Sequence, residues 1–220
     1  YTAKQLVYTE HKISGNQTIL QKLDLPIIRR DLYEDIAVLA FPIKESSKTD
    51  NVISDLDYKL GYHELGGSAP DTRFLLGNTP QNSKKPEGNT SYIIKKEQII
   101  DLSSKMDNEG NLSWQAPEGN WSIMRIGYTC TGSHVSTSSG DWQGSVLDYM
   151  STEAFDFYWN DVVEPIFKAA GDHVGTTLKY METDSWECGG MNWTENFSDE
   201  FKNYRGYDIL NYLPIVAGYV

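Results

Sequence analysis

The hydrophobic pattern of the chain changes near residue 150, and this change limits the folds that the chain can adopt. Before it, apolar and polar residues alternate, as in residues 18–23, or apolar residues form short runs such as 36–41. After it, residues 155–167 carry aromatic and aliphatic side chains spaced by three and four positions. A period of two is typical of strands and a period near 3.6 of helices, so we expect strands first and helices later.

The N-terminal half predicts an antiparallel hairpin and two longer strands. Residues 5–9 and 18–23 flank a turn, which favours their pairing as a hairpin. The continuous apolar run 36–41 predicts a strand buried on both faces or an interior strand of a sandwich. Residues 121–129 predict another long strand. Residues 44–88 are rich in Ser, Asn, Gly, Pro and Lys and indicate a loop-rich insertion.

The C-terminal part alternates predicted strands and helices. Ser151 is placed to cap a helix that extends to Gly171, in which Pro165 fits poorly. The elements expected after it are a strand over 177–184, a helix over 198–204 closed by Gly206, and a short helical segment over 208–213. This order is typical of parallel βα units, whose functional residues gather at the C-terminal ends of the strands.

Composition excludes several classes of partner. The formal net charge is −12 and the sequence contains no basic run, which disfavours binding to nucleic acid or anionic lipid. No apolar stretch reaches the length of about 18 residues that a membrane span needs.

The first residues lack the features of a signal peptide, and we expect the chain to be a piece of a longer protein. Cys130 and Cys188 are too few for a disulfide framework.

Three acids within six positions form the strongest candidate for chemistry. Glu182, Asp184 and Glu187 lie at the end of the predicted strand, with Trp186 and Trp193 nearby. Cleavage of a glycosidic bond needs one carboxylic acid beside the leaving oxygen and a second carboxylate to activate water or attack the sugar. Indole rings can stack on sugars and raise the pKa of a nearby carboxyl by desolvation. From spacing alone, however, these acids could equally cap the next helix or form surface pairs.

Asp148 is a second candidate, in a long polar loop after the strand over 121–129. It could bind a substrate hydroxyl or a cation, or help to cap the helix that begins near Ser151. The tryptophans raise a similar choice, since all six lie in the second half of the chain. They could form sugar-stacking surfaces or belong to the core.

Several segments together resemble glycoside hydrolase family 106, the α-L-rhamnosidases. The resemblance is carried by residues 33–42, by the Trp-x-x-Pro-x-Gly-x-Trp pattern within 112–132, by 147–151, and by the sequence from Asp184 to Pro214. It implies an α/β fold that is part of a (β/α)8-like barrel with an N-terminal β-rich region. On this basis we expect a β-rich region over 1–120 with the insertion at 44–88, and a partial barrel, truncated at its C-terminus, over 121–220.

The resemblance also implies an inverting hydrolase that releases terminal α-L-rhamnose from plant-type polysaccharides. It assigns Glu187 as the general acid and makes Asp148, Asp184, Asn192 and Trp193 candidates for contact with the sugar or with calcium. Trp186 is a further candidate for contact with the sugar. It further implies a calcium ion, whose ligands the sequence does not identify, and a periplasmic or secreted location.

The second catalytic carboxylate is expected beyond Val220, since no residue after Asp208 is a plausible partner for Glu187. We therefore expect these 220 residues alone to be inactive. Two alternatives remain open: a non-catalytic carbohydrate-binding module, which needs aromatic side chains on an exposed β face, and a structural domain with its acids in solvent.

Overall fold

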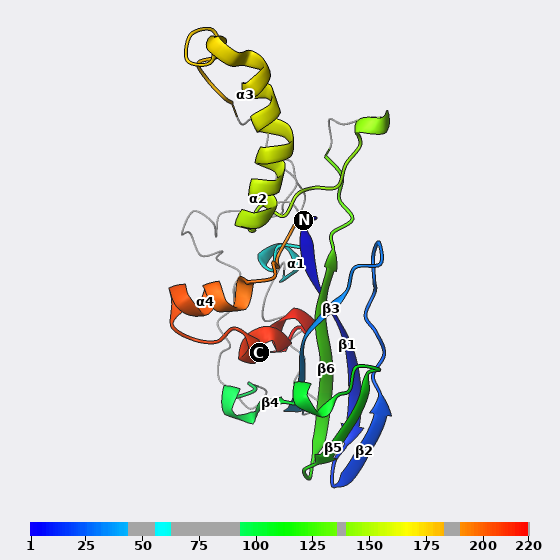
Figure 1. Cartoon of the computed structure of the whole chain (residues 1–220). Helices are drawn as coiled ribbons and strands as arrows, with labels where there is room; N and C mark the ends of the chain where they lie inside the picture. Colours follow the sequence, from blue (N-terminus) through cyan, green and yellow to red (C-terminus); the bar gives the residue numbers. More distant parts are fainter. Residues whose placement is uncertain (44–55, 63–92, 136–139, 183–189, 220) are drawn as a thin grey trace.

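The computed structural model describes residues 1–219 except 44–55, 63–92, 136–139 and 183–189. The fold is a mixed α/β arrangement in which a body of β-strands carries helices at one end and on one side (Figure 1). The strands are β1 (Lys4–Ser14), β2 (Gln17–Lys22), β3 (Glu34–Pro42), β4 (Ile100–Asp101), β5 (Asn111–Ala116) and β6 (Asn120–Cys130).

The helices are mostly short. The α-helices are α1 (Leu56–Lys59), α2 (Thr152–Tyr158), α3 (Glu164–Ala170) and α4 (Phe197–Arg205), and η5 (Trp159–Val163) is a π-helical segment. The 3₁₀ segments are η2 (Lys96–Gln98), η3 (Ser103–Lys105), η4 (Gly140–Trp142), η6 (Gly171–His173) and η7 (Leu210–Ala217). Within the described ranges, no helix has the length and apolar character needed to cross a membrane.

The strands form two antiparallel sheets, and the predicted hairpin of the first two strands is wrong. The larger sheet has the order β1-β6-β3-β4, and the smaller one pairs β2 with β5. Two strand–turn–strand units lie side by side, so that β1 pairs with β6 and β2 with β5. Their turns are joined by a hydrogen bond of 2.7 Å from the Gly15 amide to the Gly119 carbonyl. Alternation identified the strands correctly but did not determine their partners.

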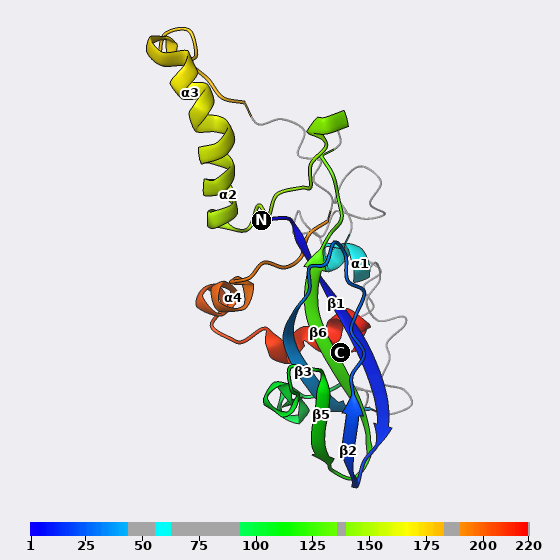
Figure 2. The ribbon, with the colours of Figure 1, turned by 45° about the vertical axis from the view of Figure 1, so that its right-hand side comes forward.

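The prediction that residues 36–41 form a doubly buried strand is confirmed. One face of β3 packs with β6 against the small sheet, in a cluster that includes Val38, Ala40 and Ile123. The opposite face, with Leu39 and Phe41, packs against the C-terminal segment. The large sheet is therefore the middle of three layers, and η7 lies against it in both ribbon views (Figure 2).

The described residues do not form the expected series of parallel βα units. β6, the first strand assigned to the partial barrel, pairs antiparallel with both β1 and β3. Residues 177–182 contain no regular strand, and Tyr180 is 88% exposed; the end of that predicted strand lies outside the described residues. A strand requires a neighbour for its backbone groups, and residues 179–182 have no strand partner. A (β/α)8 barrel is therefore not shown, and the division into domains at 120/121 stays a prediction.

The predicted helix from Ser151 to Gly171 is confirmed as the continuous series α2, η5 and α3. The Ser151 hydroxyl accepts a hydrogen bond of 3.2 Å from the Ala154 amide and caps the first turn. Gly171 ends the helix with φ of 49°. Pro165 lies in the first turn of α3, directly after the wider π turn, which accommodates a residue without an N–H group.

The two C-terminal helical segments also agree with the sequence. Helix α4 is closed by Gly206, as predicted, and Gly206 has a left-handed conformation with φ of 77°. The short segment expected over 208–213 is the 3₁₀ helix η7, which continues through Pro214 instead of stopping before it. It places Leu213 and Val216 in the core beneath β3 and β6.

Candidate functional site

The structure places the predicted site residues in two groups. Asp184, Trp186 and Glu187 lie outside the described residues, so their predicted roles stay predictions. Asp148, Asn192 and Trp193 are described, and the structure brings all three to the N-terminal end of β1. Residues 148 and 192–193 are far apart in the sequence and meet through residues 1–6.

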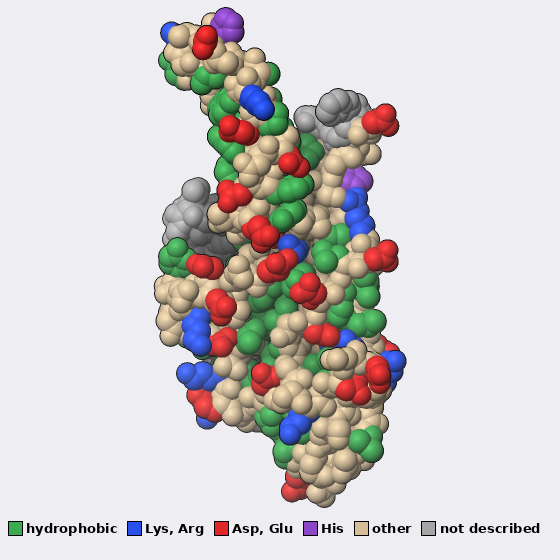
Figure 3. Space-filling model, in the orientation of Figure 1, with side chains coloured by type: hydrophobic (Ala, Val, Ile, Leu, Met, Phe, Trp, Pro, Cys, Tyr) green, Lys and Arg blue, Asp and Glu red, His purple; other side chains and the backbone are tan. Residues whose placement is uncertain are grey.

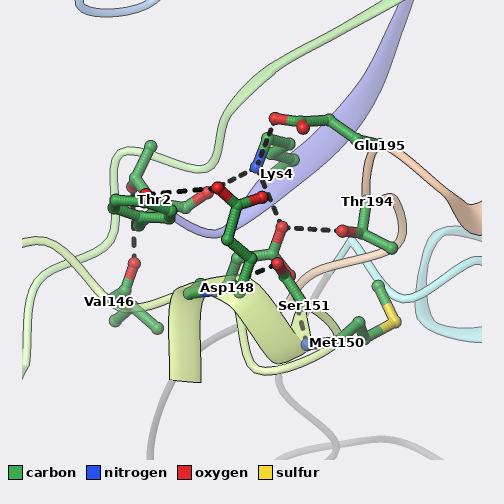
Figure 4. A network of polar contacts seen from close by, with 11 residues as sticks. Thr2, Lys4, Val146, Asp148, Met150, Ser151, Thr194 and Glu195 are labelled. Atoms are coloured by element: carbon green, nitrogen blue, oxygen red, sulfur yellow. Dashed lines mark hydrogen bonds and ion pairs between the residues drawn. The ribbon is translucent and has the colours of Figure 1, made fainter. Parts of the chain in front are cut away.

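Asp148 is completely buried and lies in a network of polar contacts (Figure 4). Its Oδ2 atom is 2.9 Å from the Lys4 ammonium and accepts a hydrogen bond of 2.8 Å from the Thr194 hydroxyl. Its Oδ1 atom accepts from the Met150 amide at 3.1 Å, and its carbonyl accepts from the Ser151 amide at 3.2 Å. The carboxylate thus shapes the turn before α2, while Ser151 provides the cap itself. No part of Asp148 is open to a ligand in this arrangement.

Lys4 is the centre of the same network. Its side chain is 5% exposed, and Glu195, whose side chain is 60% exposed, lies 3.6 Å from its ammonium. The Thr2 carbonyl accepts from the ammonium at 3.4 Å, and the Tyr128 ring centroid is 6.0 Å away. One buried cation is therefore surrounded by a carboxylate, a carbonyl and an aromatic face, with a second carboxylate at the solvent edge.

Asn192 joins the neighbouring loop to β1. Its Oδ1 atom accepts a hydrogen bond of 2.7 Å from the Leu6 backbone amide, and its backbone N–H donates to the Lys4 carbonyl at 3.2 Å. The Tyr62 hydroxyl donates to the Leu6 carbonyl at 3.1 Å, and burial raises the pKa of Tyr62 to about 12, which keeps this donor protonated. Asn192 thus has a structural part in the described site, and its contact with a sugar stays a prediction.

The described tryptophans divide between the core and a cleft. Trp193 is 2% exposed and packs against Phe197, with ring centroids 5.0 Å apart, so neither face of its indole is free for a sugar. Trp114 and Trp121 are also buried, and they meet edge to face between the two sheets. Trp159, on η5, instead lines a cleft.

That cleft, of about 660 Å³, lies beside α2 and η5. Its size falls within the range of about 300–1,000 Å³ that is usual for small-molecule sites. Aromatic residues, residues 181–182 and the loop before α2 form its walls; the lining residues are Val135, Val146, Leu147, Tyr149, Met150, Ser151, Thr152, Phe155, Tyr158, Trp159, Val163, Met181 and Glu182. Glu182 places a carboxylate at this aromatic surface. Sites that bind and cleave sugars use aromatic faces for stacking and carboxyl groups for catalysis.

The described residues do not fit a calcium ion. No group of three or more His, Cys, Asp or Glu side chains lies close enough together within the described ranges to hold a metal. Asp148, which could have bound a cation, already contacts the Lys4 ammonium, whose charge would repel one. Its carboxylate oxygens are directed to protein donors.

Lys4 and Thr194 were missed by reasoning from the sequence. A lysine near the start of the chain is normally expected in solvent. The available signal was the alternation of β1, which places Lys4 on the same face as the apolar Leu6 and hence predicts a buried charge in need of an acid.

A mixed α/β body with an aromatic cleft and a neighbouring acid defines a candidate carbohydrate-active protein. The particular family is shown by comparison with known proteins. The chain belongs to glycoside hydrolase family 106, because the model of that family, described as alpha-L-rhamnosidase, matches residues 2–220.

Two relatives illustrate the relationship. A protein named "Putative beta-glucuronidase" from Formosa agariphila is 37% identical over 220 residues, which are all of this chain and 18% of that protein. The solved structure of a rhamnosidase from Novosphingobium sp. PP1Y superposes with a TM-score of 0.71 at 18% identity, over all of this chain and 32% of that one. The second likeness concerns the fold alone. The chain spans less than a third of the length of either relative.

Proposed function

We propose that the protein containing this chain is an inverting α-L-rhamnosidase-type hydrolase that releases terminal α-L-rhamnose from plant-type polysaccharides. The observation that carries the proposal is the family match over residues 2–220. The aromatic cleft beside α2 supports it, because it combines stacking surfaces with the Glu182 carboxylate. Family membership does not favour the alternative of a non-catalytic carbohydrate-binding module.

In this proposal Glu187 is the general acid. It donates a proton to the glycosidic oxygen as the bond to the sugar breaks, while a second carboxylate, beyond these 220 residues, activates the attacking water. Asp184 and Trp186 remain proposed sugar contacts. Supporting these roles are the family membership and the position of Glu187 five residues after Glu182 of the cleft.

The remaining proposals concern the whole protein. We propose that it completes a (β/α)8-like barrel, acts in the periplasm or outside the cell, and uses calcium held by residues outside the described ranges. Family membership supports all three. Calcium would be tested by chelation: activity lost with a chelator and restored by calcium alone would support it.

The test of the function uses the full-length protein and a series of aryl α-L-rhamnosides. Glu187→Gln should lower kcat on phenyl α-L-rhamnoside by about 10²–10⁴-fold, the usual contribution of a general acid. The loss should shrink on a dinitrophenyl rhamnoside, because that leaving group departs without a proton. Glu182→Gln tests the competing acid, and Glu200→Gln on the exposed surface of α4 is the matched control.

Two results would contradict the proposal. Near wild-type turnover of Glu187→Gln on every substrate would exclude it as the acid. Cleavage of an aryl β-D-glucuronide instead of the rhamnoside by the wild-type protein would favour the activity named for the Formosa agariphila relative.

A further inference from the structure

The N-terminal end of β1 joins two segments that are distant in the sequence. The Ala3 amide donates to the Val146 carbonyl at 2.8 Å, and the Asp148 amide donates to the Tyr1 carbonyl at 2.7 Å. The Asn192 backbone N–H donates to the Lys4 carbonyl at 3.2 Å. Residues 1–4 therefore form the backbone link between the loop over 146–151 and the segment over 191–195.

The side-chain network connects the same three segments a second time. Figure 4 shows Lys4 reaching from β1 toward Asp148 beside α2, with Thr194 contacting the same carboxylate oxygen. All three side chains are almost fully buried. In an environment that excludes water these contacts are strong and directional. They therefore restrict the orientations that the loop over 146–151 can adopt beyond what its backbone hydrogen bonds allow.

The loop held by this network forms one wall of the cleft. Val146, Leu147, Tyr149, Met150 and Ser151 all line it. Asp148, in the middle of the same stretch, contacts Lys4 and Thr194 instead. The contacts of the Asp148 carboxylate therefore attach the middle of this wall to β1 and to Thr194.

Stability alone does not explain such a pair. A buried ion pair gives little net stabilisation, because desolvation of both charges offsets their attraction, and an apolar pair of similar volume often serves as well. A buried ion pair can instead restrict a segment to one arrangement, because both charges are satisfied only there.

We propose that Lys4 and Asp148 are positioning residues that hold the cleft wall over 146–151 against the segment over 191–195, and so maintain substrate affinity. This role rests on the proposed function, because it takes the cleft as the place where the rhamnoside binds. Neither side chain touches the substrate; each acts through the loop that it holds.

The experiment compares a single and a double variant of the full-length protein. Lys4→Met leaves the Asp148 carboxylate buried without its cation and should lower Tm. Lys4→Met/Asp148→Asn removes both charges and should recover most of that loss. In the double variant KM for the aryl rhamnoside should still be about tenfold above wild type, with kcat within about threefold, because the wall is no longer fixed.

The split between KM and kcat separates positioning from folding. A smaller folded fraction lowers apparent kcat and leaves KM unchanged, so a merely structural role predicts a wild-type KM in the double variant. The matched control is Lys12→Met, which removes an exposed charge from the same strand, 3.9 Å from Glu10, and should change neither constant. A wild-type KM in the stable double variant would overturn the proposal.

Amide hydrogen exchange tests the same proposal without activity. In the double variant, the Val146 and Asp148 amides should exchange about tenfold faster or more, while those of β6 should not change. Unchanged exchange at both amides would overturn the positioning role. If the wild-type protein cleaves no rhamnoside, the proposed function fails, and this measurement still decides whether the network fixes the loop.

Discussion

The sheet body and the helical series α2–η5–α3 bury their apolar residues to very different extents. β3 and β6 are covered on both faces, and Phe41 is 0% exposed. The helical series projects from that body, and apolar side chains run along it at the surface (Figures 1 and 3). Phe155 is 51% and Ile166 is 56% exposed.

This difference shows that the two regions depend on different sources of stability. The body is held by the burial of apolar area between three layers, which is the main driving force of folding. The helical series is attached to the body at few points: Ala154 and Val163 are buried, and Tyr1 stacks on Phe157 with centroids 4.6 Å apart. Its stability therefore depends more on its cap and on helix propensity.

The largest expected effect comes from truncating an aromatic residue in the body. Phe41→Ala removes a ring that packs edge to face on Tyr219, with centroids 4.8 Å apart. It should lower the free energy of unfolding of the 220-residue chain by about 3–5 kcal/mol, measured by urea denaturation. A loss below about 1 kcal/mol would mean that the layers repack freely around the cavity.

An intermediate effect, with a defined pH dependence, is expected at the ion pair of β3 and β6. The Arg125 guanidinium donates two hydrogen bonds to the Asp35 carboxylate, at 2.8 and 2.7 Å. Burial raises the pKa of Asp35, but the hydrogen bonds from Arg125 and Tyr33 and the charge of Arg125 outweigh it and hold the pKa below 3.8. Asp35→Asn should lower stability near neutral pH by about 1–2 kcal/mol.

A carboxylate with a depressed pKa stabilises the folded state above its ordinary pKa and loses this contribution as the pH falls through the folded value. The difference in stability between wild type and Asp35→Asn should therefore shrink as the pH falls below about 4. Denaturant titrations across this range measure it, with Asp199→Asn on the exposed surface of α4 as control. If the stability difference between wild type and Asp35→Asn stays constant with pH, Arg125 does not stabilise the fold through the charge of the Asp35 carboxylate.

The smallest expected effect repeats the aromatic truncation in the helical series. Phe155→Ala removes a half-exposed ring and introduces the best helix former, so it should change the stability of the 220-residue chain by about 0.5 kcal/mol or less. Together with Phe41→Ala it compares one substitution in two environments, by the same urea titration. Equal losses of unfolding free energy in Phe41→Ala and Phe155→Ala would mean that the sheet body and the helical series do not differ in how much burial stabilises them.

The sequence predicts those elements whose signals are local. The apolar run 36–41 correctly indicated β3, and the helical spacing with Ser151 and Gly171 at its ends indicated the series α2–η5–α3. Gly206 likewise marked the end of α4. In each case the residues that determine the element are within it or beside it.

What the sequence did not predict depends on residues far apart in the chain. The partner of β1 is β6, more than 100 residues away, and alternation within a strand carries no information about its neighbour. The predicted strand over 177–184 failed in its described part for the same reason. Lys4 looked like a surface residue because Asp148, which stabilises its burial, is 144 residues away. Family resemblance, and not spacing, singled out Glu187 among the neighbouring acids.

The link between residues 1–6 and the segment near Asn192 affects how the chain must fold as it is synthesised. The Leu6 amide and the Asn192 side chain that binds it are separated by 186 residues. At a synthesis rate of about 5–20 residues per second, β1 is made about 9–37 s before Asn192, 186 residues later. During this time its edge is open to pairing with other chains. β1 is thus a segment at which we expect nascent-chain aggregation, or binding of a chaperone that prevents it.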